Sequence, residues 1–562
     1  MRKRRKLVAV ALGATLASLG VLAATGAAGP SISLTPVPTA NAKTAGMSRP
    51  NLLSPELQDV TWAQGSMPVE NPANGISYYG YDDGGTFLPV PGAYSAGPPA
   101  GITYPQVAPI EAGKTEPDKN TYLVLDNQKG ADPNYDYGRH FLYQGHELGS
   151  PGYITRINLD ADGPHRVTLI ATKDASGNLP AFDGSTWDPW AKRLLFTSEG
   201  ASSGGVWQST LDVPGKVDNL QAYLGVGGYE GIQNDDRGQL YIVEDVGGST
   251  NTNKVKPPNS FVYRFKPKDP ADLTQGGTIQ ALQVLGTDGL PVTAADGNLA
   301  TYGDNPPKYA ALHVYGSSFK TKWVDLTTTT SASTLPGPGV NALAKSKGAT
   351  PFKRPENGVF QPGSKFRKYY FTETGDTDNR STATSTGGFG SLFALTQDPK
   401  SDDGSISIFY NGNLEHAGFD NIQFFGENQL AVVEDRGDTL HGQQPNGLDS
   451  AWMFDTTADY ANPAAKPVRF IAEGRDASAT IDSGLGGLGL PGSVFGNEGD
   501  NEITGIHVSD GDPGKGGILG AKKPKPFKGD GKWRAFWTQQ HGDNNTFELI
   551  PSNADRAAAY DG

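Results

Sequence analysis

Apolar, β-prone stretches that end abruptly on an acidic residue recur along this chain. "GQLYIVEDVGG" runs from Gly238 to Gly248, and "NQLAVVEDRGD" runs from Asn428 to Asp438. Further strand-like runs end at Asp126, Glu199, Glu373 and His541. A second acid precedes many of these ends by 14 to 17 residues, as Asp183, Glu230, Glu356 and Asp420 do. A unit of this kind restricts the chain to an architecture of repeated short strands.

The composition agrees with many strands joined by turns. The 562 residues include 74 glycines and 41 prolines, and long helical periodicities are scarce. About six units can be counted, with the run to Asp126 as the first. We therefore predict an all-β fold, a six-bladed β-propeller with loop insertions. In a propeller the innermost strand of each blade lines a central channel, so equivalent residues point to one axis.

Composition shifts suggest the domain boundaries. We predict a signal peptide over 1–42, a Pro/Gly-rich N-terminal arm over 43–118, a propeller over 119–550 and a short tail over 551–562. An insertion at about 265–350 interrupts the propeller and contains a short helix within "GVNALAKSKGA".

The N-terminus has the pattern of an export signal. A basic head with Arg4 and Arg5 precedes an apolar segment, and "ANA" at Ala40–Ala42 is a small-residue cleavage site. The pattern fits a twin-arginine (Tat) signal, and an ordinary Sec signal or an uncleaved anchor are the alternatives. We expect a secreted protein that engages the Tat export machinery.

The charge of the chain excludes some partners. The net charge is −13, which disfavours binding to nucleic acid and to anionic membranes. No second segment is long and apolar enough to span a bilayer, so we expect no stable membrane insertion after signal cleavage.

Acidic residues near glycine have two readings. Asp235, Asp236 and Asp438 lie next to Arg-Gly, which is typical of surface hairpins, and we interpret them as turn formers. Glutamates that directly follow an apolar strand fit that reading less well. If the acids of the repeated unit converge on one axis, they repel one another and persist there only when cations neutralise them.

The unit therefore predicts a metal site. The predicted ligands are the acids and the histidine of the repeated unit, namely Asp183, Glu199, Glu230, Glu244, Glu356, Glu373, Glu434 and His541. Glu244 and Glu434 are expected near the same axial site, unless the Asp of each Glu-Asp pair is the inward member. The chain has no cysteine and only eight histidines, so a carboxylate-rich site favours a hard cation such as Ca²⁺.

An arginine accompanies one of these acids. Arg354 precedes Glu356 by two residues in "KRPENG", and residues i and i+2 of an extended segment point the same way. Together they suit an anionic, phosphate-like substrate, which a guanidinium can bind with two hydrogen bonds. A purely structural Arg–Glu ion pair is the alternative.

Several motifs resemble the PhoX-type bacterial alkaline phosphatases. "KGATPFKRPENGVFQP" (Lys347–Pro362) is the most similar segment, and "TWDPWAKRLLFTSEG", "YEGIQ", "FDNIQ" and "EITGIHVSDG…QQHGD" follow the family's order. The resemblance covers roughly Asn120 to Glu548.

The resemblance implies a six-bladed propeller exported through Tat, with calcium and iron (Fe³⁺) at an axial site, that hydrolyses small phosphate esters. It implies that Glu199, Glu230 and Glu356 are metal ligands and that Arg354 binds phosphate, so Arg354 and Glu356 are the catalytic candidates. The chain departs from the family pattern at or near Asp183, where the family has a cysteine. It departs again at Gly200 and Asn357.

Two other functions stay open at this stage. One is a calcium-stabilised propeller that serves as a binding module, which the missing cysteine favours. The other is a lactonase-like hydrolase, which predicts activity on uncharged esters and no dependence on Arg354.

Overall fold

The structure is a computed structural model of the chain. It describes residues 33–37, 51–65, 67–80, 115–147, 151–304, 306–398, 400–437, 440, 443, 449–473, 502–508, 534–540 and 544–552. The fold is all-β, as predicted, with 43% strand and 8% helix. Within these residues we find no helix with the length and apolar character of a membrane span. The predicted signal segment 1–42 lies outside the described residues except for 33–37.

Antiparallel sheets of successive strands make up the molecule. The first contains β5 (Pro117–Val124), β6 (His140–His146), β7 (Ile154–Asn158) and β8 (Val167–Ala171). The second contains β9 (Ser185–Asp188), β10 (Arg193–Ser198), β11 (Gly205–Ser209) and β12 (Val217–Asn219). In both, each strand pairs with the next along the chain, which keeps the connections short.

The largest sheet consists of two such meanders joined edge to edge. The first meander contains β13 (Tyr229–Asn234), β14 (Leu240–Glu244), β15 (Val262–Pro267) and β16 (Gly277–Val284). The second contains β18 (Gly358–Phe360), β19 (Lys368–Glu373), β20 (Ser391–Gln397) and β21 (Asp403–Asn411). Strand β17 (Phe319–Thr328) pairs with both β16 and β21 and links the two outer edges.

Two further sheets recruit strands from the N-terminal part of the chain. One contains β22 (Phe419–Phe424), β23 (Gln429–Glu434), β24 (Ser450–Asp455), β25 (Val468–Ala472) and β1 (Leu52–Leu53). The other contains β26 (Glu502–Val508), β27 (Ala535–Gln540), β28 (Thr546–Pro551) and β2 (Leu57–Ala63). A separate hairpin is formed by β3 (Pro68–Ala73) and β4 (Ile76–Tyr78).

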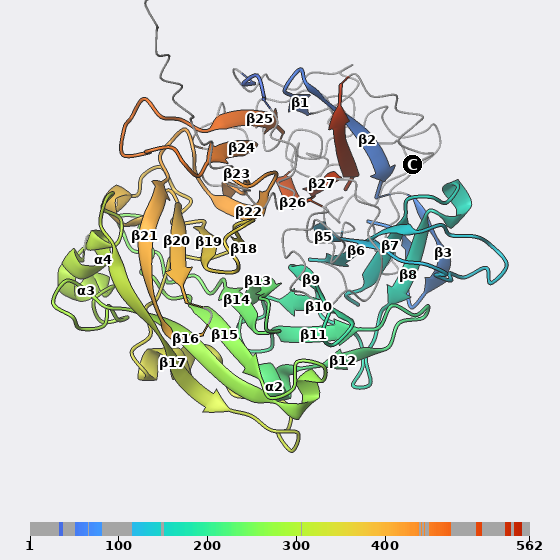
Figure 1. Ribbon diagram of the computed structural model, residues 1–562, viewed down its shortest axis with the longest axis horizontal. Coiled ribbons are helices and arrows are strands. Elements are labelled where there is room, and N and C mark those ends of the chain that lie inside the picture. The colour runs from blue at the N-terminus through green and yellow to red at the C-terminus, as the bar shows by residue number, and fades with distance from the viewer. Residues whose placement is uncertain are drawn as a thin grey trace, which may run out of the picture.

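The first strands of these meanders surround a common centre. Strand β5 contacts β9, and contacts continue through β13, β18, β22 and β26 back to β5. Figure 1 shows these strands innermost, with the later strands of each sheet farther out. The sheets therefore have a propeller-like arrangement.

Aromatic and aliphatic side chains pack between neighbouring sheets. Phe141 and Tyr143 of the first sheet share one apolar cluster with Phe196 and Trp207 of the second. Because both faces of most strands are covered, runs such as "LYIVE" are buried at every position instead of alternating with polar residues. This explains why the apolar strands read as continuous blocks in the sequence.

The helices are short and lie in connections. Among the described residues they are α2 (Gln221–Leu224), α3 (Leu299–Tyr302), α4 (Pro307–Ala311) and α5 (Val340–Ser346), with 3₁₀ turns at Gly163–His165, Leu273–Gln275 and Thr384–Thr386. The predicted helix is present as α5. The predicted insertion at 265–350 starts too early, because β15 and β16 belong to a sheet up to Val284.

The predicted N-terminal arm contributes to the sheets. Strand β2 pairs antiparallel with β28 along Leu57–Ala63, so an early segment forms the outer strand of the last sheet. Trp62 on this strand is 2% exposed, and its Nε1 donates a hydrogen bond to Glu548 Oε2 (2.7 Å). The Arg166 guanidinium lies 4.8 Å from the Trp62 ring centroid. Strand β2 therefore joins residues 57–63 to residues 546–551 in one sheet.

We expect Trp62→Ala to destabilise the fold by about 3–5 kcal/mol, because it removes a buried aromatic ring and leaves a cavity. Urea unfolding measures this loss. Leu290→Ala is the matched control, since Leu290 is 60% exposed and its truncation should change stability by less than about 0.5 kcal/mol. Equal stability of the two variants would contradict a stabilising role of β2.

Candidate metal centre

Acidic residues lie where the innermost strands begin. Glu502 is the first residue of its innermost strand, and Asp118, Glu230 and Asp420 are the second residues of theirs. Asp183 and Glu356 lie two residues before the strands that follow them. The first strands contact one another around the centre, so these starts are neighbours in space. The sequence unit thus places carboxylates from distant parts of the chain at one end of the axis.

Irregular pairing between the first and second strands changes the direction of several of these side chains. The register between first and second strands shifts between Pro117 and Asn120, between Tyr229 and Ile232, and between Phe419 and Ile422. Asp118, Glu230 and Asp420 lie within these shifted stretches. A β-bulge commonly redirects a side chain beside a functional site, and here it does so at equivalent points of three sheets.

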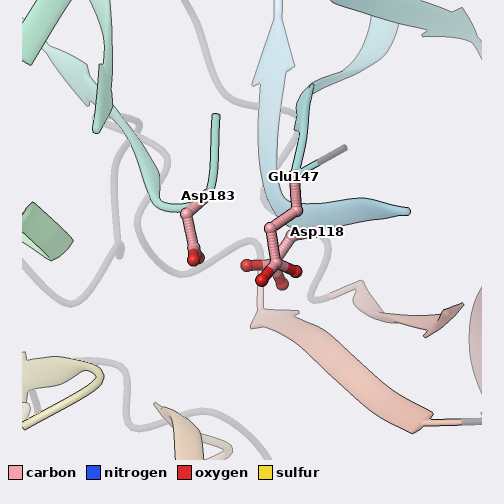
Figure 2. A group of neighbouring side chains, drawn as sticks. All are labelled: Asp118, Glu147 and Asp183. Atoms are coloured by element: carbon pink, nitrogen blue, oxygen red, sulfur yellow. The ribbon is translucent and has the colours of Figure 1, made fainter. Parts of the chain in front are cut away.

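Eight carboxylates form one continuous group, which we call the acidic cluster. Four overlapping sets have ligand atoms within 4.8 Å of one another: Asp118, Glu147 and Asp183; Asp183, Glu199 and Glu230; Glu199, Asp245 and Glu356; and Glu230, Glu356 and Asp420. Figure 2 shows the first set, in which Asp118 lies on β5, Glu147 directly follows β6 and Asp183 lies in the connection before β9.

Burial and mutual repulsion dominate the electrostatics of the acidic cluster. Burial raises the pKa of Asp183, and the neighbouring charge of Asp118 raises it further. The pKa of Glu230 is raised in the same way by burial and by Asp183. Burial raises the pKa of Glu199 to about 7. Without a cation these groups favour the protonated form, and a bound cation would take the place of the protons.

The donors of the acidic cluster fit a hard cation. Asp183 Oδ1 and Glu230 Oε2 are buried, and no N–H or O–H group of the described structure donates to either oxygen. Buried carboxylate oxygens without donors are costly unless an ion binds them. The donor atoms are all oxygen, which is the preference of Ca²⁺. The acidic cluster therefore offers a place for a metal ion.

One buried lysine offsets part of the negative charge. Lys119 is 4% exposed and its Nζ donates a hydrogen bond to Ile506 O (3.0 Å). Burial lowers the pKa of Lys119 to about 8, while Asp118 and Asp420 act in the opposite direction. A single ammonium cannot neutralise the eight carboxylates of the acidic cluster. Lys119 was not among the residues predicted for the site.

Arg354 lies at the edge of the acidic cluster. Its Nε donates to Asp245 Oδ2 (2.8 Å), its Nη2 lies 2.7 Å from the same oxygen, and Nη2 lies 3.4 Å from Glu356 Oε1. The prediction that Arg354 and Glu356 face one site is confirmed. The reason given for it was wrong, because Arg354 has a left-handed backbone (φ 56°) and the segment is not extended there. The guanidinium side chain retains 21% exposure.

The end of β19 holds the segment that contains Arg354 and Glu356. Thr374 N donates to Arg354 O (2.9 Å), and Thr374 Oγ1 donates to Glu356 Oε1. Glu373 Oε1 accepts a hydrogen bond from Lys353 N (2.8 Å). Strand β19 thus fixes a backbone conformation that a non-glycine residue rarely adopts.

The structure brings together Asp183, Glu199, Glu230 and Glu356 of the predicted ligands, and it places three others elsewhere. Glu244 accepts hydrogen bonds from Tyr263 Oη (2.8 Å) and Asn341 Nδ2 (2.9 Å). Glu373 accepts from Lys353 N, as above. Among the described residues, none of Glu244, Glu373 and Glu434 belongs to the acidic cluster. His541 lies outside the described residues.

The alternation of side chains explains this difference. Glu244, Glu373 and Glu434 are the last residues of their strands, and each is fully buried. Successive residues of a strand point in opposite directions, so the next residue faces the axis instead. Asp245, which follows Glu244, belongs to the acidic cluster. The Asp of this Glu-Asp pair is therefore the inward member.

Asp235 and His146 have structural roles. Asp235 Oδ1 accepts hydrogen bonds from Arg237 N (2.8 Å) and Gln239 N (3.0 Å), which confirms its turn role. His146 is fully buried, and its two ring nitrogens lie within hydrogen-bond distance of Thr115 and Thr155 hydroxyls. We conclude that His146 is structural, whereas its neighbour Glu147 belongs to the acidic cluster.

Comparison with protein families bears on this geometry. The family model of alkaline phosphatase PhoX matches residues 228–452, which include Glu230, Arg354, Glu356 and Asp420. Over this stretch the chain is similar to the PhoX-type alkaline phosphatases. The chain has no cysteine. The part of the acidic cluster formed by Asp118, Glu147, Asp183 and Glu199 lies outside the matched residues.

Other comparisons add little. Among curated proteins, none matches the chain significantly. The X-ray structure of a hypothetical selenium-binding protein from Sulfolobus tokodaii is similar with a TM-score of 0.29 and 13% identity, over 67% of this chain and 85% of that one.

Proposed function

We propose that this PhoX-type chain is a secreted, metal-dependent phosphatase that hydrolyses small phosphate esters at the acidic cluster. The observation that carries the proposal is Arg354, a partly exposed guanidinium fixed beside a buried group of carboxylates within the region that matches the PhoX family. A cation held by carboxylates together with an arginine suits a phosphoryl group, because both bind its negative oxygens.

The blade count and export route are parts of the same proposal. If the two meanders of the largest sheet are counted separately, the first strands around the centre give six blades, with β17 as an added link. Export through Tat rests on the N-terminal pattern with Arg4 and Arg5. A reporter fused to residues 1–42 tests it: loss of export on Arg4→Lys/Arg5→Lys supports Tat, and unchanged export favours Sec.

Calcium is the metal that the donor set fits best. Asp183, Glu199, Glu230 and Glu356 would hold it, with Asp118 and Asp420 as further carboxylates of the acidic cluster. Iron (Fe³⁺) is proposed from the family resemblance alone, since an oxygen donor at Asp183 stands where the family has a thiolate. Elemental analysis of protein purified from its native export route distinguishes the two metals.

The chain's own residues have definite roles in such a reaction. When bound, a divalent cation supplies a Lewis acid and neutralises charge on the phosphoryl group. Arg354 would bind a non-bridging oxygen and stabilise the charge that develops there. Asp245 and Glu356 keep its guanidinium in place, so little rearrangement is needed during the reaction.

A direct assay tests the proposed function. We expect hydrolysis of an aryl phosphate by calcium-loaded protein, and its loss after exhaustive chelation. The corresponding aryl acetate is the control substrate. Activity on the acetate alone would favour a lactonase-like hydrolase, and no activity on either with calcium and iron supplied would favour a calcium-stabilised binding module.

Thr374 provides a prediction on metal binding. Thr374→Val removes the hydroxyl that donates to Glu356, so we expect roughly 10–100-fold weaker Ca²⁺ binding, as for other partners of metal ligands. Calorimetric titration with Ca²⁺ measures it. Thr374→Ser keeps the hydroxyl and should stay close to wild type. Equal affinities of the valine and serine variants would show that Thr374 does not position Glu356.

A further inference from the structure

The connection between β14 and β15 packs directly against Arg354. A Cβ added at Gly247 would lie 3.6 Å from Arg354 Cδ, so the backbone of this connection borders the arginine side chain. Farther along it, Val255 is fully buried and anchors the segment. The residue after this anchor, Lys256, is thereby brought to the same side of the acidic cluster as Arg354.

Asp376 fixes the position of Lys256. Asp376 Oδ1 accepts a hydrogen bond from Lys256 N (3.0 Å) and lies 3.0 Å from Lys353 Nζ, and Asp376 Oδ2 accepts from Ser381 Oγ (2.6 Å). Lys353 directly precedes Arg354 in the chain. One buried carboxylate therefore joins the backbone of Lys256 to the segment that carries Arg354.

The ammonium group of Lys256 is not committed to a partner. Lys353 Nζ is paired with Asp376 and Lys119 Nζ with Ile506 O, but across the described residues no ion pair or hydrogen bond involves Lys256 Nζ. Burial lowers the pKa of Lys256 and the positive charge of Arg354 lowers it further, while Asp245, Asp376 and Glu356 act in the opposite direction. Two cations held close together favour the binding of an anion between them.

We propose that Lys256 is a substrate-binding residue that, together with Arg354, contacts the phosphoryl group. The inference rests on the proposed phosphatase function. Arg354 uses Nε and Nη2 on Asp245 and Glu356, so its guanidinium is partly committed before any substrate binds. Lys256 supplies a further charge with three donors, which a tetrahedral anion with several negative oxygens can use.

The experiment uses calcium-loaded protein and inorganic phosphate as the probe. Inhibition of aryl phosphate hydrolysis by phosphate, and the KM for the ester, are measured for wild type, Lys256→Met and Lys256→Arg. Lys254→Met is the matched control, because it removes the same charge from the same connection, two residues away. Loss of a charge-assisted contact should weaken phosphate binding roughly tenfold or more in Lys256→Met.

Each outcome decides the matter. Weaker phosphate binding in Lys256→Met, recovery in Lys256→Arg and wild-type behaviour of Lys254→Met would support the proposal. Equal effects of Lys256→Met and Lys254→Met, or none, would overturn it and leave the phosphatase function standing. A lower melting temperature of Lys256→Met with unchanged inhibition by phosphate would show a structural role only. Wild type that neither hydrolyses the ester nor binds phosphate would contradict the proposed function itself.

Discussion

Replacing Arg354 with lysine is expected to lower kcat for phosphate-ester hydrolysis by about 10²–10³-fold, the usual loss when one group that stabilises developing charge is removed. Lysine keeps the positive charge but loses the planar fork that contacts Asp245 and Glu356 together. The ammonium would then neither hold its position nor bind an oxygen with two hydrogen bonds. Steady-state kinetics and a thermal melt on the same sample measure both consequences.

The thermal melt distinguishes a role of Arg354 in binding the phosphoryl group from a purely structural role in an ion pair. Because the side chain is partly exposed, the stability that its ion pairs contribute is modest, and we expect the melting temperature to change little. Arg367→Lys is the control, since Arg367 is exposed and in the same sheet region. A fall in melting temperature with wild-type turnover per folded molecule would assign Arg354 a structural role.

The propeller-like fold was predictable because its unit recurs in the sequence. "YEGIQ" and "FDNIQ" share an aromatic residue, an acid, a small or polar residue, isoleucine and glutamine. Both form the start of a first strand with a register shift at the acid. The same local sequence therefore builds the same bulge, and Glu230 and Asp420 reach the acidic cluster from different sheets.

The direction of single side chains was harder to predict. Glu147, Glu199 and Asp245 each follow the last residue of a second strand, and all three belong to the acidic cluster. Of these, only Glu199 was among the predicted ligands. Its strand ends on Ser198, so Glu199 is the single acid at that strand end, whereas two acids compete where β14 ends. A one-residue change of strand end reverses the side-chain direction, and the sequence does not show where a strand ends to that accuracy.

The roles of Thr374 and Asp118 were not predicted, because they depend on contacts between segments that are distant in the sequence. Thr374 directly follows the last residue of β19, the position at which Glu147, Glu199 and Asp245 follow their strands. Its role is visible only in the structure, where its hydroxyl donates a hydrogen bond to Glu356. Asp118 lies just before the predicted start of the propeller at 119. Neither a hydroxyl in a buried strand end nor a single aspartate at a boundary carries a distinctive local pattern.

Removal of calcium is expected to destabilise the protein strongly, and more so as the pH rises. A ligand at a hundredfold excess over its dissociation constant stabilises the native state by about 2.7 kcal/mol. Thermal melts of chelated and calcium-loaded protein measure this difference. An unchanged melt after exhaustive chelation would contradict a metal at the acidic cluster.

The pH dependence follows from the raised pKa values. Burial raises the pKa of Glu199 from 4.5 to about 7. In metal-free protein this group therefore supports folding fully below about pH 4.5, and its contribution is lost as the pH rises toward 7. Bound calcium would favour the ionised carboxylates instead, so the stability gained from calcium should be larger at pH 8 than at pH 5.

A matched pair of variants ties this effect to the acidic cluster. Glu230→Gln removes one buried charge, so the chelated protein should melt at a higher temperature than chelated wild type, while calcium should add less stability. Asp126→Asn removes one exposed charge outside the cluster, where the Asp126 side chain is 51% exposed and pairs with Arg139. It should leave both melts nearly unchanged. If both variants changed the melting temperatures equally, calcium would act through the overall charge of the protein and not by binding the carboxylates of the acidic cluster.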